Sequence, residues 1–207
     1  MCPDFVYLAS ASPRRQQLLK QIGVPFQILN VEIDESVGAT EDPPAYVTRL
    51  AAAKAGAGLC LSEARGLLAR PVLAADTTVA IDGEILGKPL NGEDGRRMLR
   101  LLSGRTHEVL TAVALATPSG LASRLSRSEV TFRAIGAAEA HDYWDTGEPR
   151  DKAGGYAIQG YGAVFVADMR GSYSGVMGLP LYETAEFLRS AGVSLWLPGT
   201  AGGDDEH

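Results

Sequence analysis

An acidic residue, Asp76, stands in the middle of an apolar stretch at 72–81. Aspartate is uncommon in β-strands, and a buried carboxylate without partners is energetically costly. Asp76 therefore needs cations, hydrogen-bond donors or a metal ion around it, which makes it a candidate general base or metal ligand. The alternative is a carboxylate satisfied by backbone N–H groups near a strand end. Because side chains alternate along a strand, Thr77 should point away from the face of Asp76, unless the strand ends or bulges there.

Two adjacent arginines, Arg14 and Arg15, follow Pro13 in a segment typical of a helix N-terminus. That end of a helix carries about half a positive charge and normally favours acidic residues. A bound anion would reverse the unfavourable electrostatics, and hydroxyl, backbone N–H and guanidinium groups all suit phosphate oxygens. Ser10 and Ser12 supply hydroxyl groups in the same segment. The alternative is a pair of solvated arginines on an ordinary helix.

A Gly-rich segment at 151–160 contains Lys152 and Gln159. Glycine lets the backbone approach a ligand closely, and the glutamine amide offers both a donor and an acceptor, which suits the edge of a nucleobase. The alternative is a flexible loop with incidental polar residues.

Three single charges complete the set of candidates. Lys54 lies in line with the apolar stripe of an expected helix at 43–61, so its ammonium group either snorkels from the edge of that face or points into a cleft at a phosphate. Lys88 follows an expected hairpin, and Glu35 stands in an acidic loop after an expected strand. Either charge alone would be ordinary surface charge in most proteins.

Hydrophobic periodicity and turn signals predict the elements that position these residues. The sequence Asp82-Gly83 predicts a tight hairpin. Because long antiparallel pairs stand beside crossover units, we expect an α/β fold with a mixed sheet, not a doubly wound parallel one. Expected strands cover 5–9, 26–31, 72–81, 84–87, 107–116, 122–135 and 163–169. Expected helices cover 13–22, 43–61, 91–103, 137–145 and 179–191, with an irregular segment at 148–162.

Composition and charge limit the class of protein. With 207 residues, 45% hydrophobic and 21% charged, the chain has an ordinary globular composition and length for one core or for two lobes sharing a cleft. The net charge of -6, without a broad basic face, argues against binding a nucleic acid polymer, whereas a small phosphorylated ligand needs only a few cations. No apolar run approaches roughly 20 residues and no signal peptide is evident, so we expect no membrane association and a cytoplasmic location.

The cysteines and histidines suggest no metal site. Cys2 and Cys60 are too few and too far apart to predict a disulfide scaffold or a zinc site. His107, His141 and His207 are also far apart, and we expect surface or structural histidines.

Five ordered sequence blocks resemble the Maf family, namely residues 8–19, 75–89, 102–107, 151–154 and 176–181. The resemblance extends over about residues 5 to 192. It implies a fold like that of inosine triphosphate pyrophosphatases, with a twisted mixed sheet and two lobes flanking a central cleft, usually in a homodimer. We therefore expect one catalytic domain at 1–197, followed by a flexible Gly-rich tail at 198–207.

Two features resemble the dTTP/UTP pyrophosphatase branch of that family and not the branch that favours 7-methyl-GTP. They are Thr77 after the key aspartate and the segment 156–160, Tyr-Ala-Ile-Gln-Gly. The resemblance implies a hydrolase of the α–β phosphoanhydride bond that converts dTTP or UTP to the monophosphate and pyrophosphate. It implies that Asp76 is the proton acceptor and that Arg14, Thr77 and Gln159 tune substrate choice. It also implies a site lined by Ser10, Ser12, Arg15, Glu35, Lys54, Lys88 and Lys152.

A divalent cation, Mg²⁺ or Mn²⁺, is expected to bridge phosphate oxygens and the carboxylates of Glu35 and Asp76. Whether Asp76 accepts the proton or helps to hold the metal stays open at this point. Two alternatives also stay open: a broad-specificity house-cleaning pyrophosphatase, which would also act on modified nucleotides, and a nucleotide-binding regulator of cell division. A desolvated carboxylate beside the phosphates favours hydrolysis, because it would repel the ligand of a pure sensor. No phosphate-binding loop or kinase signature supports a phosphotransferase.

Overall fold

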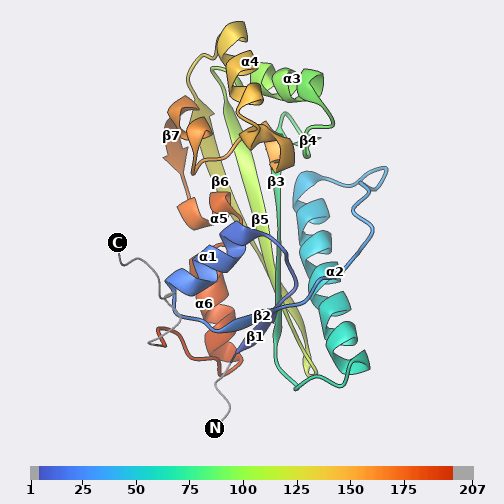
Figure 1. Ribbon diagram of the computed structural model, residues 1–207. Coiled ribbons are helices and arrows are strands. Elements are labelled where there is room, and N and C mark those ends of the chain that lie inside the picture. Colours follow the sequence, from blue (N-terminus) through green and yellow to red (C-terminus); the bar gives the residue numbers. More distant parts are fainter. Residues whose placement is uncertain (1–4, 198–207) are drawn as a thin grey trace.

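A computed structural model describes residues 5–197 of the chain (Figure 1). The predicted tail at 198–207, Cys2 and His207 lie outside these residues. The described strands form one seven-stranded sheet in the order β2-β1-β3-β5-β6-β7, with β4 also paired to β3. β1 runs parallel to β2 and β3, and all other pairs are antiparallel, so the predicted mixed α/β sheet is confirmed. The strands are β1 (Val6–Leu8), β2 (Phe26–Ile28), β3 (Val72–Ile81), β4 (Glu84–Leu86), β5 (Thr106–Thr117), β6 (Gly120–Phe132) and β7 (Val166–Arg170).

Helices cover both faces and one end of this sheet (Figure 1). In the described part of the chain, no helix combines the length and the apolar character needed to cross a membrane. The α-helices are α1 (Pro13–Gln21), α2 (Pro43–Ala64), α3 (Gly92–Leu102), α4 (Ala137–Asp145), α5 (Tyr173–Met177) and α6 (Leu181–Ser190). Three 3-10 helices lie between α4 and β7: η1 (Glu148–Asp151), η2 (Ala153–Gly155) and η3 (Tyr161–Phe165).

The alternation of side chains along β3 distributes the apolar core between the two faces of the sheet. Leu73 and Ala75 pack into a cluster with residues of α1 and α6, whereas Val72 and Ala74 pack into a cluster with residues of α2. The close packing of α2 requires Gly58, since a Cβ atom there would lie 2.7 Å from Cγ1 of Val72. We call the part of the molecule built on α1, α2 and α6 the lower lobe.

A third apolar cluster forms the opposite end of the molecule, which we call the upper lobe. It joins residues of α3 and α4 to the far ends of β3, β5 and β6. The strands β5 and β6 run the full height of the molecule and belong to both lobes (Figure 1). The lobes are therefore connected by a continuous sheet.

The bounds of two predicted strands differ from the structure, and one helix was not predicted. The strand predicted at 163–169 begins only at Val166, because the chain before it forms the 3-10 helix η3. The second predicted strand is confined to 26–28, since its partner β1 is equally short. The five-residue helix α5 was not predicted. The hairpin at Asp82-Gly83 is confirmed, with φ angles of 51° and 81° as a tight turn of this type requires.

Candidate active site

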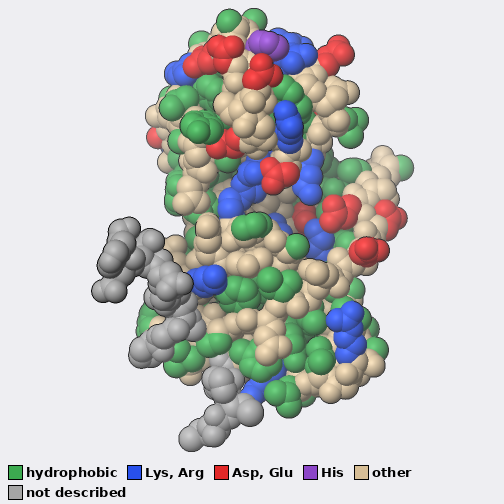
Figure 2. Space-filling model, in the orientation of Figure 1, with side chains coloured by type: hydrophobic (Ala, Val, Ile, Leu, Met, Phe, Trp, Pro, Cys, Tyr) green, Lys and Arg blue, Asp and Glu red, His purple; other side chains and the backbone are tan. Residues whose placement is uncertain are grey.

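A cleft of about 1190 Å³ lies between the two lobes. Lys, Arg, Asp and Glu side chains gather around the waist of the molecule, where the surface is hollowed (Figure 2). The cleft is lined by every residue that the sequence analysis proposed for the site: Ser10, Ser12, Arg14, Arg15, Glu35, Lys54, Asp76, Thr77, Lys88, Lys152 and Gln159. The fold therefore brings together candidates from six separate stretches of the chain.

The strand β3 opens onto the cleft along an unpaired stretch of one edge. β1 pairs only with the first two residues of β3, and β4 pairs only with its last three. Between these partners, side chains from both faces of the strand reach the same opening, so Asp76 and Thr77 both line the cleft. The expectation that the strand must end or bulge there is wrong, because pairing with β5 continues in register from Val72 to Ala80.

The N-terminus of α1 faces the cleft without a side-chain cap. Ser12 is the residue before the helix, but its side chain makes no capping hydrogen bond, and the first turn contains no acidic residue. Arg14 is half-buried at the same end, and burial lowers the pKa of its guanidinium group. Uncapped backbone N–H groups beside a cation are a favourable place for a phosphate group.

Arg15 has a different environment from its neighbour. Its guanidinium group donates hydrogen bonds to the carbonyl oxygen of Gly178 at 2.8 Å, to Oγ of Ser10 at 3.0 Å and to Oγ1 of Thr77 at 3.3 Å. These contacts connect α1, β3 and the turn after α5. Arg15 thus fixes two other residues of the cleft as well as contributing charge.

Lys54 connects two acidic residues that come from different elements. Its Nζ lies 2.6 Å from Oδ1 of Asp76 and 2.7 Å from Oε1 of Glu35. The Lys54 side chain is only 15% exposed, so it is not a lysine snorkelling to solvent. Its hydrogen bond is the main cause that lowers the pKa of Glu35. The carboxylate of Asp76 is therefore paired with a side-chain cation, and the alternative of a carboxylate satisfied by backbone N–H groups does not describe this site.

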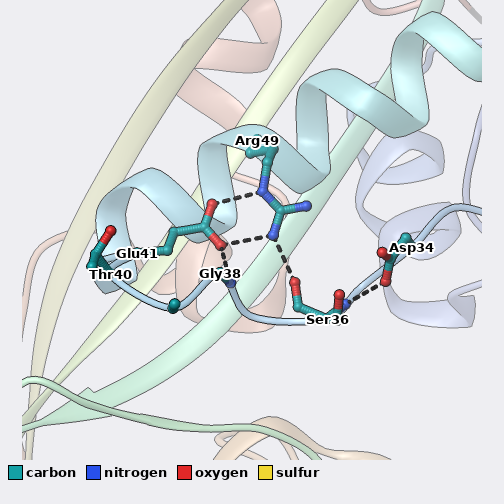
Figure 3. A pocket seen from close by; sticks show the side chains of 7 residues that line it. Asp34, Ser36, Gly38, Thr40, Glu41 and Arg49 are labelled. Atoms are coloured by element: carbon teal, nitrogen blue, oxygen red, sulfur yellow. Dashed lines mark hydrogen bonds and ion pairs between the residues drawn. The ribbon is translucent and has the colours of Figure 1, made fainter.

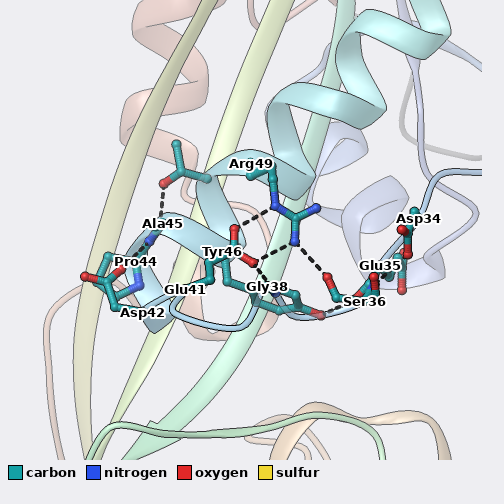
Figure 4. Close-up of polar contacts among 11 residues, drawn as sticks. Asp34, Glu35, Ser36, Gly38, Glu41, Asp42, Pro44, Ala45, Tyr46 and Arg49 are labelled. Atoms are coloured by element: carbon teal, nitrogen blue, oxygen red, sulfur yellow. Dashed lines mark hydrogen bonds and ion pairs between the residues drawn. The ribbon is translucent and has the colours of Figure 1, made fainter.

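The loop that carries Glu35 is held against the first turns of α2 (Figures 3 and 4). Arg49 binds both carboxylate oxygens of Glu41, at 2.6 and 2.7 Å, and also the carbonyl oxygen of Ser36 at 2.9 Å. The hydroxyl of Tyr46 donates to the carbonyl oxygen of Glu35 at 3.0 Å. A second hollow of about 360 Å³ lies along this loop, and none of the eleven candidates lines it: its lining is Asp34, Ser36, Gly38, Ala39, Thr40, Glu41 and Arg49.

The upper wall of the cleft carries two exposed candidates and one that is largely buried. Lys88 and Gln159 are exposed, and Lys152 forms an ion pair with the neighbouring Asp151. The segment that carries Lys152 is fixed to the end of β4 by a backbone hydrogen bond of 3.0 Å from Gly154 to Gly87. The exposed side chains of Lys88 and Gln159 are therefore accessible to a ligand between the lobes.

The family of the chain follows from comparison with known proteins. The sequence matches the family described as Maf-like protein over residues 5–191, nearly the whole of the described chain. The chain belongs to the Maf family. Three similar proteins are named dTTP/UTP pyrophosphatase. The protein of Saccharophagus degradans is 52% identical, over 92% of this chain and 90% of its own length, and that of Cupriavidus pinatubonensis is 52% identical, over 91% of this chain and 97% of its own length. The protein of Alkalilimnicola ehrlichii is 54% identical, over 91% of this chain and 95% of its own length. Among solved structures, the Ham1 protein of Staphylococcus aureus matches 65% of this chain and 73% of its own with a TM-score of 0.44 and 14% identity.

The sequence interpretation missed several residues of this Maf cleft. Tyr46, Glu148 and Tyr156 line it but were not proposed as site residues. Tyr46 precedes Leu50 by four residues, and Leu50 precedes Lys54 by four. This spacing places Tyr46 on the same face of α2 as Lys54, and it could have marked Tyr46 as a residue of the site. Glu148 lies in an irregular segment without hydrophobic periodicity. No local sequence pattern marks it as a cleft residue, and only its contacts in the folded structure do.

Proposed function

We propose that this Maf protein is a nucleoside triphosphate pyrophosphatase that hydrolyses dTTP and UTP to the monophosphate and pyrophosphate. The main support is one arrangement: the buried carboxylate of Asp76 and the cation-rich N-terminus of α1 face the same cleft. The close relatives described above carry the name of this activity. A pure nucleotide sensor would gain nothing from a carboxylate held beside the phosphates.

In this reaction a water molecule attacks the α-phosphorus, so that a new P–O bond forms and the bond from the α-phosphorus to the bridging oxygen breaks. Pyrophosphate leaves with the electron pair of that bond, and the proton of the water passes to Asp76. Lys54 contacts Oδ1 of Asp76, so the second oxygen of the carboxylate is available to a water molecule in the cleft.

The phosphate chain is proposed to lie against the N-terminus of α1. Ser12 and the free backbone N–H groups supply hydrogen bonds, and Arg14 supplies charge that stabilises the phosphate oxygens. Lys88 and Lys152 approach from the opposite wall and bind the outer phosphates. Arg15 contributes mainly by holding the hydroxyl groups of Ser10 and Thr77 in place.

The carboxylates in the cleft fit a divalent cation that arrives with the nucleotide. Oxygen atoms of Glu35 and Asp76 converge on one point, the Nζ atom of Lys54, although they come from a loop and a strand. Within residues 5–197, no cluster of three or more His, Cys, Asp or Glu side chains could hold a metal ion unaided. Mg²⁺ typically binds through one or two carboxylates together with substrate phosphates, and Mn²⁺ accepts the same oxygen ligands. When bound, such an ion supplies positive charge to the phosphate oxygens.

Base selection is assigned to Gln159, Thr77 and Arg14. Gln159 is exposed at the upper wall, and its amide has the donor and acceptor needed for the edge of uracil or thymine. A broad-specificity enzyme that also removes modified pyrimidine nucleotides would use the same chemistry, and only the base preference distinguishes the two.

The test is a phosphate-release assay on UTP, dTTP, CTP, ATP and GTP, with and without Mg²⁺ or Mn²⁺. We expect UTP and dTTP to give phosphate only when an added inorganic pyrophosphatase splits the pyrophosphate product. Phosphate without the added enzyme would indicate cleavage at the γ-phosphate and contradict the proposal. Equal rates for all five nucleotides would support the broad-specificity alternative. Light scattering of the purified chain and microscopy of a tagged copy test the two further predictions, a homodimer and a cytoplasmic location.

A further inference from the structure

The carboxylate of Glu148 lies at the centre of the turn that carries Gln159. Oε1 of Glu148 accepts a hydrogen bond from the backbone N–H of Gly162 at 2.9 Å and from the hydroxyl of Tyr143 at 2.7 Å. Oε2 accepts one from the backbone N–H of Tyr161 at 2.9 Å. One side chain thus satisfies two backbone donors of the turn and a buried tyrosine.

The same network reaches the other side of the turn. The hydroxyl of Tyr143 accepts a hydrogen bond from the backbone N–H of Ala157 at 3.2 Å while it donates to Glu148. The chain is therefore held on both sides of Gln159, at 157 and at 161–162. Within residues 5–197 the Gln159 amide itself makes no hydrogen bond, so its backbone attachments determine where it points.

The turn packs closely against the carboxylate of Glu148. Gly160 has a φ angle of 151°, and a Cβ atom at this position would lie 2.1 Å from Oε2 of Glu148. Only glycine fits between the turn and the carboxylate. Burial opposes ionisation of Glu148, but its hydrogen bonds outweigh burial and lower its pKa, so the acceptor is charged at neutral pH. Hydrogen bonds to a charged acceptor are stronger than those between neutral groups.

We propose that Glu148 is a positioning residue for base selection: its carboxylate holds the turn at 157–162 so that Gln159 is presented to the base of the nucleotide. This inference rests on the proposed function, in which Gln159 contacts the base. Glu148 acts through the turn and takes no part in the chemistry at the α-phosphorus.

The first test is Glu148→Gln, which keeps the shape of the side chain. Its NH₂ group would face a backbone N–H group that now donates to Glu148, so at least one hydrogen bond of the network is lost. We expect KM for UTP to rise about tenfold and kcat to change less than about twofold. The ratio of kcat/KM for UTP to that for CTP should fall about tenfold, because a displaced Gln159 discriminates poorly between the two bases.

The second test is a double-mutant cycle with Gln159→Ala, because coupled residues give non-additive effects. If Glu148 acts through Gln159, the Glu148→Gln change should no longer alter the UTP to CTP ratio in the Gln159→Ala background. Glu139→Gln is the matched control. Glu139 also accepts charge-assisted hydrogen bonds in the upper lobe, from Arg133 at 2.9 Å, but it does not line the cleft. The Glu139→Gln variant should leave both KM for UTP and the UTP to CTP ratio unchanged.

The outcomes separate the inference from the proposed function. If Gln159→Ala leaves the UTP to CTP ratio unchanged, the assignment of Gln159 to the base fails, and this inference fails with it. If Gln159→Ala lowers the ratio but Glu148→Gln does not, the proposed function stands and the positioning role is wrong. A uniform loss of kcat for every nucleotide would instead place Glu148 in the catalytic machinery. Should Glu148→Gln fail to fold, Tyr143→Phe removes one donor and one acceptor of the same network and should shift the ratio in the same direction by a smaller factor.

Discussion

The two walls of the cleft differ in how firmly their side chains are held. On the lower wall, the side chains of Lys54 and Asp76 are 15% and 12% exposed and bind each other, and Arg15 is fixed by three hydrogen bonds. On the upper wall, Lys88 and Gln159 are exposed and depend on the backbone of irregular segments for their position. Charge stabilisation at the α-phosphorus requires fixed geometry, which the lower wall supplies through direct side-chain contacts. The position of Gln159 on the upper wall depends instead on a hydrogen-bonded turn. Under the proposed function, the lower wall performs the chemistry with side chains that fix one another, and the upper wall contacts the base through a turn fixed by its backbone.

The largest effect is expected from Asp76→Asn on the lower wall. Asparagine keeps the shape of the side chain and its contact with Lys54 but cannot accept a proton from water. We expect kcat to fall about a thousandfold, as is typical when a general base is removed, with the affinity for UTP little changed. Steady-state kinetics and calorimetric titration of UTP would measure the two quantities separately. Turnover near the wild-type rate would remove Asp76 from its proposed role and with it the distinction between the walls.

The next largest effect is expected from Lys54→Met. The variant leaves two carboxylates, those of Glu35 and Asp76, facing each other without the cation that now lies between them. We expect kcat to fall about a hundredfold, since an electrostatic contact of the site is lost. The affinity for Mn²⁺ in the absence of nucleotide should rise about tenfold, because an added cation now relieves the repulsion. Electron paramagnetic resonance of Mn²⁺ measures this affinity without any catalysis.

Lys54→Arg is the control for that measurement. It keeps a positive charge near both carboxylates and should leave the affinity for free Mn²⁺ close to that of the unchanged protein. If Lys54→Met also fails to increase Mn²⁺ affinity, the two carboxylates do not form the cation site, and Glu35 has another purpose.

The sequence predicted residues on both walls of the cleft, but it missed those whose place depends on contacts distant along the chain, for a physical reason. The position of Lys54 followed from the helical spacing of its apolar neighbours, and that of Asp76 followed from a charge in an apolar strand. Both signals are local. Glu148 acts through hydrogen bonds to residues 13 and 14 positions later in a segment without periodicity, and no local pattern marks it. The unpaired edge of β3 depends on where β1 and β4 stop pairing, which is a tertiary property.

A third prediction concerns a buried histidine behind the upper wall. Nε2 of His107 lies 2.8 Å from the hydroxyl of Tyr156, a residue of the cleft lining, and burial lowers the pKa of His107 to about 4. The unfolded chain binds a proton at His107 near its ordinary pKa of 6.5, whereas the folded chain does so only near 4. Between these values the unfolded state binds more protons, so stability falls as the pH falls below 6.5. This group alone should make the protein about 2 kcal/mol less stable at pH 5 than at pH 7.5.

His107→Gln tests this prediction, because glutamine can still form a hydrogen bond with Tyr156 but does not titrate. Urea unfolding at the two pH values should show that the unchanged protein loses about 2 kcal/mol more than the variant does. The lower wall carries no described histidine, so this sensitivity would belong to the upper wall. Equal losses in both proteins would mean that His107 is protonated in the folded state or is not deeply buried.

The smallest effect is expected from Tyr46→Phe, which tests the least firmly held part of the lower wall. The side chain of Glu35 is 53% exposed, unlike that of Asp76, and its backbone carbonyl is held by the Tyr46 hydroxyl at 3.0 Å. Loss of one neutral hydrogen bond at a partly exposed site costs about 1 kcal/mol, which corresponds to a change of about fivefold. We therefore expect the Mg²⁺ concentration for half-maximal rate to rise by about that factor, while kcat at saturating Mg²⁺ stays the same. A fall in kcat that added Mg²⁺ does not restore would show that the loop at 34–41 positions more than a cation ligand, and the lower wall would then be as dependent on loop geometry as the upper one.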